Sequence, residues 1–136
     1  MYRDFQSRNI MIKESKPYFI DYQSGRKGAL QYDLASLLYD AKADIPQEVR
    51  ESLIDHYILK LKEIIKVNAR EFTHYFWYFA AIRILQALGA YGFLGLSRGK
   101  KKFLESIPYA VKNINCILNN RIENGNLSYK KYFRKT

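Results

Sequence analysis

The sequence predicts a domain that is mainly α with a short N-terminal β-hairpin, which places it in the α+β class. Two apolar runs of strand length stand close together within residues 1–28, with turn-forming residues between them. From Asp33 onward, apolar residues recur every three or four positions, which is typical of amphipathic helices. The chain has 136 residues, of which 48% are hydrophobic, so a buried core is expected.

We expect residues 1–136 to form a single domain with three parts. Residues 1–28 form a loop and a hairpin, residues 33–122 a helical part, and residues 123–136 a basic tail. No internal repeat or low-complexity tract interrupts this order. The short β element therefore precedes all of the helices.

The hairpin strands are predicted in "NIMIK" at 9–13 and "PYFID" at 17–21. The segment "ESKP" lies between them and supplies the turn. The loop "SGRKG" at 24–28 follows, with two glycines. These segments are all short, so the hairpin is expected to be small.

The first two helices are each predicted to begin at an acidic cap. Asp33 opens the helix at 33–43, and Asp44 opens the next, because a carboxylate accepts hydrogen bonds from free N–H groups in the first turn. Pro46 suits the first turn of the second helix. Its predicted buried face consists of Val49, Leu53, Ile54, Tyr57, Ile58, Leu61, Ile64 and Ile65.

A third and most apolar helix is predicted over 71–91, followed by a break at "SRGKKK". The segment 76–96 is about long enough to span a bilayer. Because Arg83 and Gln86 lie near its middle, we expect instead a helix buried on most sides of a soluble domain, with no membrane partner. A fourth helix is predicted with one apolar face, made by Phe103, Ile107, Val111, Ile114 and Leu118.

Charge and cysteine content indicate the setting. The formal net charge is +10, which favours anionic partners such as nucleotides, nucleic acid or acidic lipid without choosing among them. A lone Cys116 allows no internal disulfide, and the polar N-terminus carries no signal-peptide core. We therefore expect a cytoplasmic protein.

A set of oxygen ligands flanks the predicted hairpin. Asp4 and Asn9 are five residues apart, and Asp21 follows at the end of the second strand. Carboxylate and amide oxygens are ligands of Mg²⁺, and a further carboxylate can accept the proton of an attacking hydroxyl. This combination is what phosphoryl transfer requires.

The segment "YRDFQSRN" at 2–9 resembles the kinase catalytic loop H-R-D-x-x-x-x-N. With "IDYQSG" at 20–25 and "YDLASLLYD" at 32–40, it is similar to the aminoglycoside/choline phosphotransferase family. Together with "AAIRILQALGAY" at 80–91, these strings look closest to bacterial kinases that phosphorylate N-acetylmuramate and N-acetylglucosamine on the anomeric hydroxyl. The resemblance implies the C-terminal lobe of a protein-kinase-like fold.

The resemblance also implies residue roles, with ATP and Mg²⁺ as cofactors and a sugar or amino sugar as acceptor. Asp4 would be the catalytic base, Asn9 and Asp21 would hold Mg²⁺, and 1–28 would contain the catalytic loop and the metal-site hairpin. The supporting residues would be Arg3 and Asp33, and contacts to phosphate or acceptor would come from Gln6, Arg8, Gln23 and Arg83.

Several residues keep two interpretations. Arg8 either contacts a phosphate or pairs on the surface. Arg83 either pairs with a carboxylate, Asp33 or Asp40, or faces the acceptor. The aromatic residues Tyr75, Trp77 and Tyr78 either pack in the core or form a wall of the acceptor site.

The chain departs from the family pattern in three places. Tyr2 stands where the motif has His, Gln6 where relatives carry Lys or His, and Arg8 where they carry Gly or Glu. A glycine-rich loop and a strand lysine for the nucleotide are not found in the 136 residues, so we expect the N-terminal nucleotide lobe to lie outside them, as a partner in cis. The fragment alone is then expected to be inactive.

An alternative is a kinase-like binding module without catalysis. The basic segment 98–102 and the basic, aromatic tail 129–135 could bind RNA or protein, although a solvated surface is the preferred interpretation and nucleic acid is not the expected partner. His56 and His74 have no metal-ligating neighbours at helical spacing, so we expect no metal site there.

Overall fold

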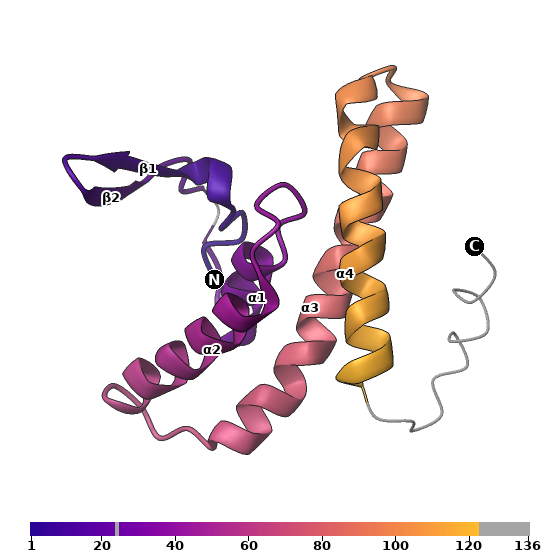
Figure 1. The fold of residues 1–136 in the computed structure, drawn as a ribbon. Coiled ribbons are helices and arrows are strands. Elements are labelled where there is room, and N and C mark those ends of the chain that lie inside the picture. Colours follow the sequence, from indigo (N-terminus) through magenta and orange to yellow (C-terminus); the bar gives the residue numbers. More distant parts are fainter. Residues whose placement is uncertain (24, 123–136) are drawn as a thin grey trace.

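The computed structural model describes residues 1–23 and 25–122 (Figure 1). It is mostly helical with a two-stranded antiparallel hairpin near the N-terminus, as the sequence predicts. The predicted basic tail lies outside the described residues. The elements in chain order are a 3₁₀ turn at Ser7–Asn9, strands β1 (Ile10–Lys13) and β2 (Lys16–Phe19), helices α1 (Gln31–Leu38), α2 (Gln47–Lys62) and α3 (Ala69–Gly92), a π-helical turn at Phe93–Ser97, a 3₁₀ segment at Lys101–Ser106, and helix α4 (Ile107–Asn120).

The hairpin projects from the helical body beside α1 (Figure 1). β1 and β2 pair from Ile10 opposite Phe19 to Lys13 opposite Lys16, so the turn contains only Glu14 and Ser15. Both turn residues have positive φ, at 50° and 61°, which is the backbone of a two-residue type I′ turn. Nearly all hairpin side chains are exposed, and its stability therefore depends on its own pairing.

Both predicted helix caps are wrong. α1 begins at Gln31, so Asp33 lies inside its first turn, and the N-cap position is held by Leu30 without a side-chain bond. α2 has Pro46 at its N-cap position, also without a side-chain bond. The carboxylates are engaged elsewhere: Asp33 binds the N-terminal loop, and Asp44 lies 3.6 Å from the Lys112 ammonium.

α2 buries less of its predicted apolar face than expected. Ile54 and Ile58 are buried, but Val49, Leu53 and Ile64 are exposed. The third buried residue of this helix is Arg50, whose guanidinium lies 4.4 Å from the Tyr39 ring centre and donates to Asn113 Oδ1 at 3.0 Å. A ring face and an amide oxygen therefore accommodate this buried cation.

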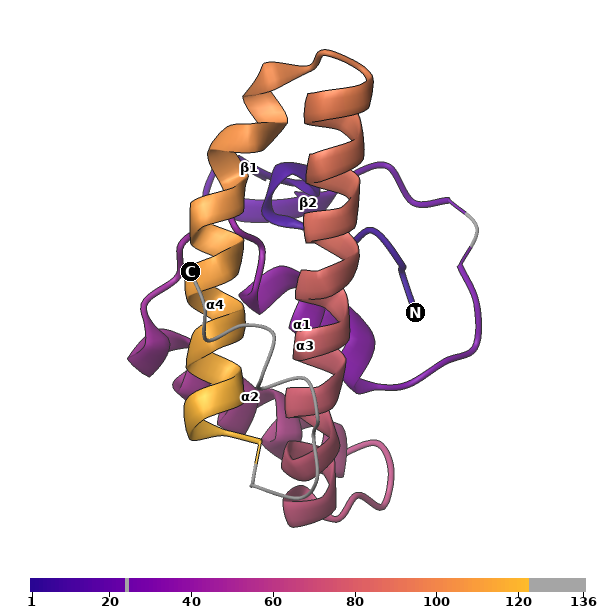
Figure 2. The same cartoon turned by 90° about the vertical axis from the view of Figure 1, so that its right-hand side faces the viewer.

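α3 is the central helix of the body. It packs most extensively against α1 and α4, and it runs side by side with α4 (Figures 1 and 2). Its Asn68 cap accepts a hydrogen bond from the Glu71 N–H at 3.1 Å, so the helix starts two residues before the predicted position. Its buried residues are Phe72, Phe76, Trp77, Ala80, Ala81 and Ile84.

The expectation that this helix is buried on most sides is wrong, because one face only is covered. Tyr75, Ile82 and Leu85 on the other face are 45–48% exposed. The helical segment Ala69–Ser97 is long and apolar enough to cross a membrane by length and composition, and 22% of its apolar window is buried. The covered face ties α3 into the same core as α1 and α4.

The chain reverses direction between α3 and α4 around two glycines. Gly95 is buried where an added Cβ would collide with the Leu104 side chain, and Gly99 has a φ of 66°. Pro108 occupies the first turn of α4, where a missing N–H costs no helical bond. Helix α4 then contributes Ala110, Asn113, Ile114, Ile117 and Leu118 to the buried interior.

Candidate active site

The N-terminal loop is fixed to α1 at two points. At its start, the Asp33 carboxylate accepts the backbone N–H of Tyr2 at 2.5 Å and that of Arg3 at 2.9 Å. At its end, Asp40 Oδ2 accepts the N–H and the hydroxyl of Ser7 at 3.1 and 2.5 Å. Asp40 lies just beyond α1, so the two ends of the loop are held by α1 and by the residues that directly follow it.

Asp4 and Asn9 meet inside this loop. The Asn9 amide donates from Nδ2 to the Asp4 backbone oxygen at 2.8 Å and to the Asp4 carboxylate at 3.4 Å. Arg8 donates to the same carboxylate at 2.8 Å, so its guanidinium forms an ion pair with Asp4, the predicted base. Both side-chain bonds end on Asp4 Oδ2, and no hydrogen bond to Oδ1 is present among the described residues.

The hairpin brings Asp21 to the Asn9 end of this loop. The Ile20 N–H donates to the Asn9 backbone oxygen at 3.0 Å, which extends the strand pairing by one step and leaves Asp21 next in the chain. Asp21 has a φ of 62°, a left-handed conformation that redirects the chain after the strand. Gln23 Nε2 lies 3.3 Å from Asp21 Oδ1 and contacts this carboxylate.

Tyr2, which stands at the position of the motif histidine, connects the N-terminal loop to the end of the hairpin. Its hydroxyl donates to the Ile20 backbone oxygen at 2.6 Å, and its ring lies 5.5 Å from Phe5 and 5.1 Å from Tyr22 between centroids. Partial desolvation, followed by the charge of Asp21 and the neighbouring Tyr22, raises the pKa of the Tyr2 phenol. The phenol therefore stays protonated at neutral pH and remains a donor.

Asn9 and Asp21 carry oxygen atoms of the kinds that Mg²⁺ prefers. Mg²⁺ prefers oxygen ligands, takes one or two carboxylates and keeps several waters. Asn9 is buried and uses Nδ2 as its donor, so its Oδ1 remains an acceptor without a hydrogen bond among the described residues. Within the same residues, no three His, Cys, Asp or Glu side chains lie close enough together to hold a metal ion. His56 and His74 therefore belong to no such group.

Arg83 lies on α3 against the adjacent face of α1. It donates to the Tyr32 hydroxyl and to Ser36 Oγ, both at 3.0 Å, and its guanidinium lies 4.9 Å from the Tyr32 ring centre. The predicted carboxylate partners are wrong: Arg83 makes no ion pair within residues 1–23 and 25–122. Its buried Nε has no hydrogen-bond partner there.

Tyr91, two turns further along α3, links this helix to the loop electrostatically. Burial and the charge of Asp40 raise the pKa of the Tyr91 phenol, whereas the cations Arg8 and Arg83 act in the opposite direction. These charged groups therefore lie within electrostatic reach of one another.

The predicted aromatic patch divides in two. Trp77 is buried and stacks at right angles on Tyr39 and Phe76, as core packing requires, whereas Tyr75 is 48% exposed. Trp77 and Tyr78 also line a hollow that contains no residue of the N-terminal loop. The packing interpretation therefore applies to Trp77, and the described contacts do not link the patch to Asp4.

Two anchoring residues escaped the sequence reasoning about the site. Ser7 and Asp40 fix the end of the loop, yet neither was assigned a role there. A signal was available for Asp40, because it follows Asp33 by seven residues and so falls near the same helical face. Gln6, in contrast, was singled out, and its backbone oxygen accepts the Asn9 N–H at 2.9 Å.

Comparison with known proteins gives a family match over half of the chain. The model of the ecdysteroid kinase-like family matches residues 2–69, which contain the N-terminal loop, the hairpin, α1 and α2. The matched segment therefore includes Asp4, Asn9, Asp21 and Asp33.

Two curated relatives are also similar. An N-acetylmuramate/N-acetylglucosamine kinase of Neisseria meningitidis serogroup B (strain ATCC BAA-335 / MC58) is 31% identical over 111 residues, which is 79% of this chain and 33% of that protein. A protein of the same name from Pseudomonas aeruginosa PAO1 is 23% identical over 111 residues, with the same shares. The chain spans about one third of the length of these relatives.

Proposed function

Because the chain belongs to the ecdysteroid kinase-like family, we propose that it forms the part of an ATP-dependent small-molecule kinase that carries the catalytic base and the metal ligands. One observation supports this most: Asn9 binds the Asp4 carboxylate and, through its backbone, the strand end that leads to Asp21. The proposed base Asp4 and the proposed ligand Asn9 thus lie next to a loop end held by Asp40, and the proposed ligand Asp21 follows the strand that pairs with Asn9. Fixed geometry of this kind is what phosphoryl transfer needs.

In the proposed reaction, the acceptor hydroxyl gives its proton to Asp4 as its oxygen bonds to the γ-phosphorus of ATP. The bond from that phosphorus to the bridging oxygen breaks, and ADP leaves. Arg8 and Asn9 hold Asp4 Oδ2, so Oδ1 is the oxygen that receives the proton. Asn9 and Asp21 would hold Mg²⁺, which offsets the phosphate charge when bound.

The acceptor in this proposal is a hydroxyl of a sugar or amino sugar. The names of both relatives support this class, because each is an N-acetylmuramate/N-acetylglucosamine kinase. Choline-like and aminoglycoside acceptors are disfavoured in the proposal. We further propose that the 136 residues alone do not turn over ATP, which their one-third coverage of the relatives supports.

Metal binding tests the proposed site directly on this chain. Titration with Mn²⁺, a paramagnetic substitute for Mg²⁺, should give a saturable signal by electron spin resonance. We expect Asp21→Asn to weaken binding at least about tenfold, since a charged ligand is lost. The matched control is Asp44→Asn, an exposed carboxylate outside the site, and an equal loss in both variants would contradict the assignment.

Catalysis is tested with a chimera in which the matching third of the Neisseria kinase is replaced by the 136 residues of this chain. We expect the chimera to phosphorylate N-acetylglucosamine with ATP, and Asp4→Asn to lower kcat by about 10²–10⁴-fold, the usual contribution of a general base. A chimera that unfolds cooperatively but phosphorylates no amino sugar would overturn the proposed function. Equal rates with and without Asp4 would overturn its role as base.

A further inference from the structure

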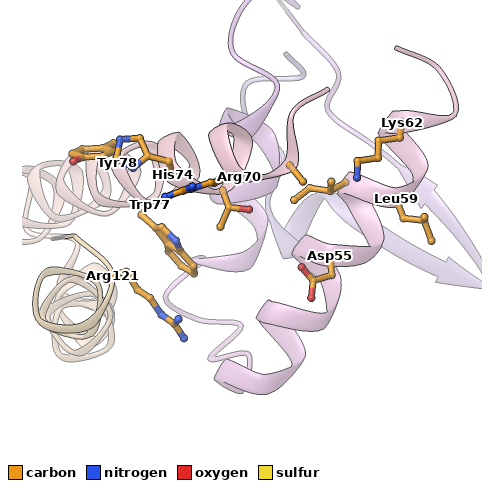
Figure 3. Close-up of a pocket in the computed structure, with 11 residues that line it drawn as sticks. Asp55, Leu59, Lys62, Arg70, His74, Trp77, Tyr78 and Arg121 are labelled. Carbon is orange, nitrogen blue, oxygen red and sulfur yellow. The ribbon is translucent and has the colours of Figure 1, made fainter. Parts of the chain in front are cut away.

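A hollow of about 830 Å³ opens between the second half of α2, the first turns of α3 and the residue that follows α4 (Figure 3). Its volume is within the range of about 300–1,000 Å³ that small-molecule sites occupy. No residue assigned above to the kinase reaction lines it. The hollow is therefore a separate candidate binding site from the N-terminal loop.

Two exposed cations in the lining of this hollow outnumber its one carboxylate. Lys62, at the end of α2, and Arg70, in the first turn of α3, are both exposed and make no ion pair within the described part of the chain. Asp55 is the carboxylate of the lining, one against these two cations. An unpaired excess of positive charge in a concave, partly apolar setting favours an anion.

The wall of the hollow across from Lys62 is aromatic. Trp77 is 8% exposed and lies against the hollow, with Ile58 buried beneath. The Arg121 guanidinium lies 5.1 Å from the Trp77 ring centre and is also paired with Glu51, so its position is fixed from two sides. In Figure 3, Trp77 and Arg121 lie on one side of the hollow, with Asp55 and Lys62 across from them.

We propose that this hollow binds a small organic anion that carries one phosphate or carboxylate on a planar ring. Lys62 and Arg70 attract the anionic group, and the ring packs against Trp77 and the Arg121 guanidinium, which presents a flat face of its own. Asp55 disfavours a second anionic group across the hollow, so a polyphosphate fits less well than a single phosphate. This site goes beyond the proposed kinase reaction and does not depend on it.

Trp77 provides a direct readout, because it is the single tryptophan of the chain. Its fluorescence, excited selectively over tyrosine, is followed on the full chain with four probes: phenyl phosphate, benzoate, phenol and inorganic phosphate. We expect a saturable change with phenyl phosphate, benzoate or both, and at least about tenfold weaker binding of phenol and inorganic phosphate, each of which lacks one of the two groups. The ratio between phenyl phosphate and benzoate shows which anionic group the site prefers.

Two variants test the assigned cations. Lys62→Gln and Arg70→Gln should each weaken binding of the better probe about fivefold to tenfold, since each removes one of the two charges that attract the anion. The matched control is Lys60→Gln, which removes one positive charge from the same helix. Lys60 is paired with Glu63 and does not line the hollow. It should change binding less than about twofold.

Three results would overturn the proposal. The first is no saturable response to phenyl phosphate or benzoate below about 10 mM, in fluorescence and in amide NMR shifts of Arg70 and Trp77 alike. The second is an equal loss of binding in Lys60→Gln and Lys62→Gln, which would indicate attraction by overall charge. The third is phenol binding as tightly as phenyl phosphate. All three substitutions are at exposed side chains, so a cooperative unfolding transition is expected in each variant.

Discussion

The carboxylate of Asp33 lies in the first turn of α1, yet it binds residues about thirty positions earlier in the chain. It accepts two backbone N–H groups from the N-terminal loop and lies 3.9 Å from the Met1 ammonium. Bonds to a charged acceptor are stronger than those between neutral groups. Without this acceptor, two loop N–H groups lose their hydrogen-bond partner. The loop then opens locally under conditions in which the rest of the fold is still intact.

Replacing Asp33 by Ala should loosen the loop and weaken the fold. We expect the free energy of unfolding to fall by about 1–2 kcal/mol, and hydrogen exchange at Tyr2 and Arg3 to accelerate at least about tenfold, since both amides lose their acceptor. Urea denaturation and amide exchange by NMR measure the two effects. Asp44→Ala removes an exposed carboxylate and should cost less than about 0.5 kcal/mol; a cost equal to that of Asp33→Ala would contradict the anchoring role.

Among the helices and strands, the hairpin is the element least dependent on the core. Its strands are exposed and its apolar residues Met11, Ile12 and Phe19 are more than half exposed. Glu14 and Ser15 both adopt left-handed φ values, which ordinary residues adopt at an energetic cost. Stability of this element is therefore limited by its turn.

Changing the turn to Asn-Gly, by Glu14→Asn with Ser15→Gly, should stabilise the hairpin. We expect about 0.5–1 kcal/mol, because these residues suit the type I′ turn. The gain should appear as slower amide exchange in β1 and β2, with little change in the unfolding midpoint of the helices. Glu14→Gly with Ser15→Pro is the opposing control, since proline cannot adopt the positive φ, and exchange in the strands should accelerate.

At this scale, periodicity and turn signals predicted which elements form, but not their starts or their buried faces. The hairpin and helices α1 to α4 correspond to the predicted segments. The two acidic caps were wrong because Asp33 and Asp44 bind groups distant in sequence, which local spacing does not reveal. Arg50 was overlooked because its burial depends on Tyr39 and on Asn113, sixty-three positions away.

Across the whole molecule, buried and partly buried phenols make the free energy of unfolding depend on pH at the alkaline end. Burial raises the pKa of Tyr39, Tyr57 and Tyr91, with nearby Asp33 and Asp40 adding to the shift for the last two. A phenol with a raised folded-state pKa binds its proton more tightly in the folded state. Its stabilising contribution is therefore complete below the unfolded value near 10 and is lost as the pH rises through the folded value.

We expect the free energy of unfolding to decline as the pH increases above about 10, and Tyr39→Phe to make that decline less steep. Phenylalanine keeps the ring that faces Arg50 and removes only the ionisable hydroxyl. Urea denaturation at several pH values measures the slope. Tyr22→Phe, at an exposed side chain, is the matched control; a steeper decline in Tyr39→Phe than in the original chain would contradict the explanation.

The candidate site was predictable where its parts are close in sequence. The contact between Asp4 and Asn9 follows from a loop motif, and the kinase-like family it indicated is confirmed. The roles of Asp4, Asn9 and Asp21 in catalysis stay predictions. The contacts of Arg83 with Tyr32 and Ser36 were not predictable, because they depend on how α1 and α3 pack, and a carboxylate was the partner expected from charge alone.

The two loop anchors, Asp33 in α1 and Asp40 just after it, also limit how residues 34–39 can vary in length. Asp33 lies in α1 and Asp40 two residues beyond its end, so the turn of about 100° per helical residue between them sets the direction in which Asp40 lies. Inserting or deleting one codon between them would swing Asp40 by more than a quarter-turn and separate it from Ser7. Among homologous genes, gaps in an alignment should therefore be absent from 34–39 and accumulate instead in the connection between β2 and α1.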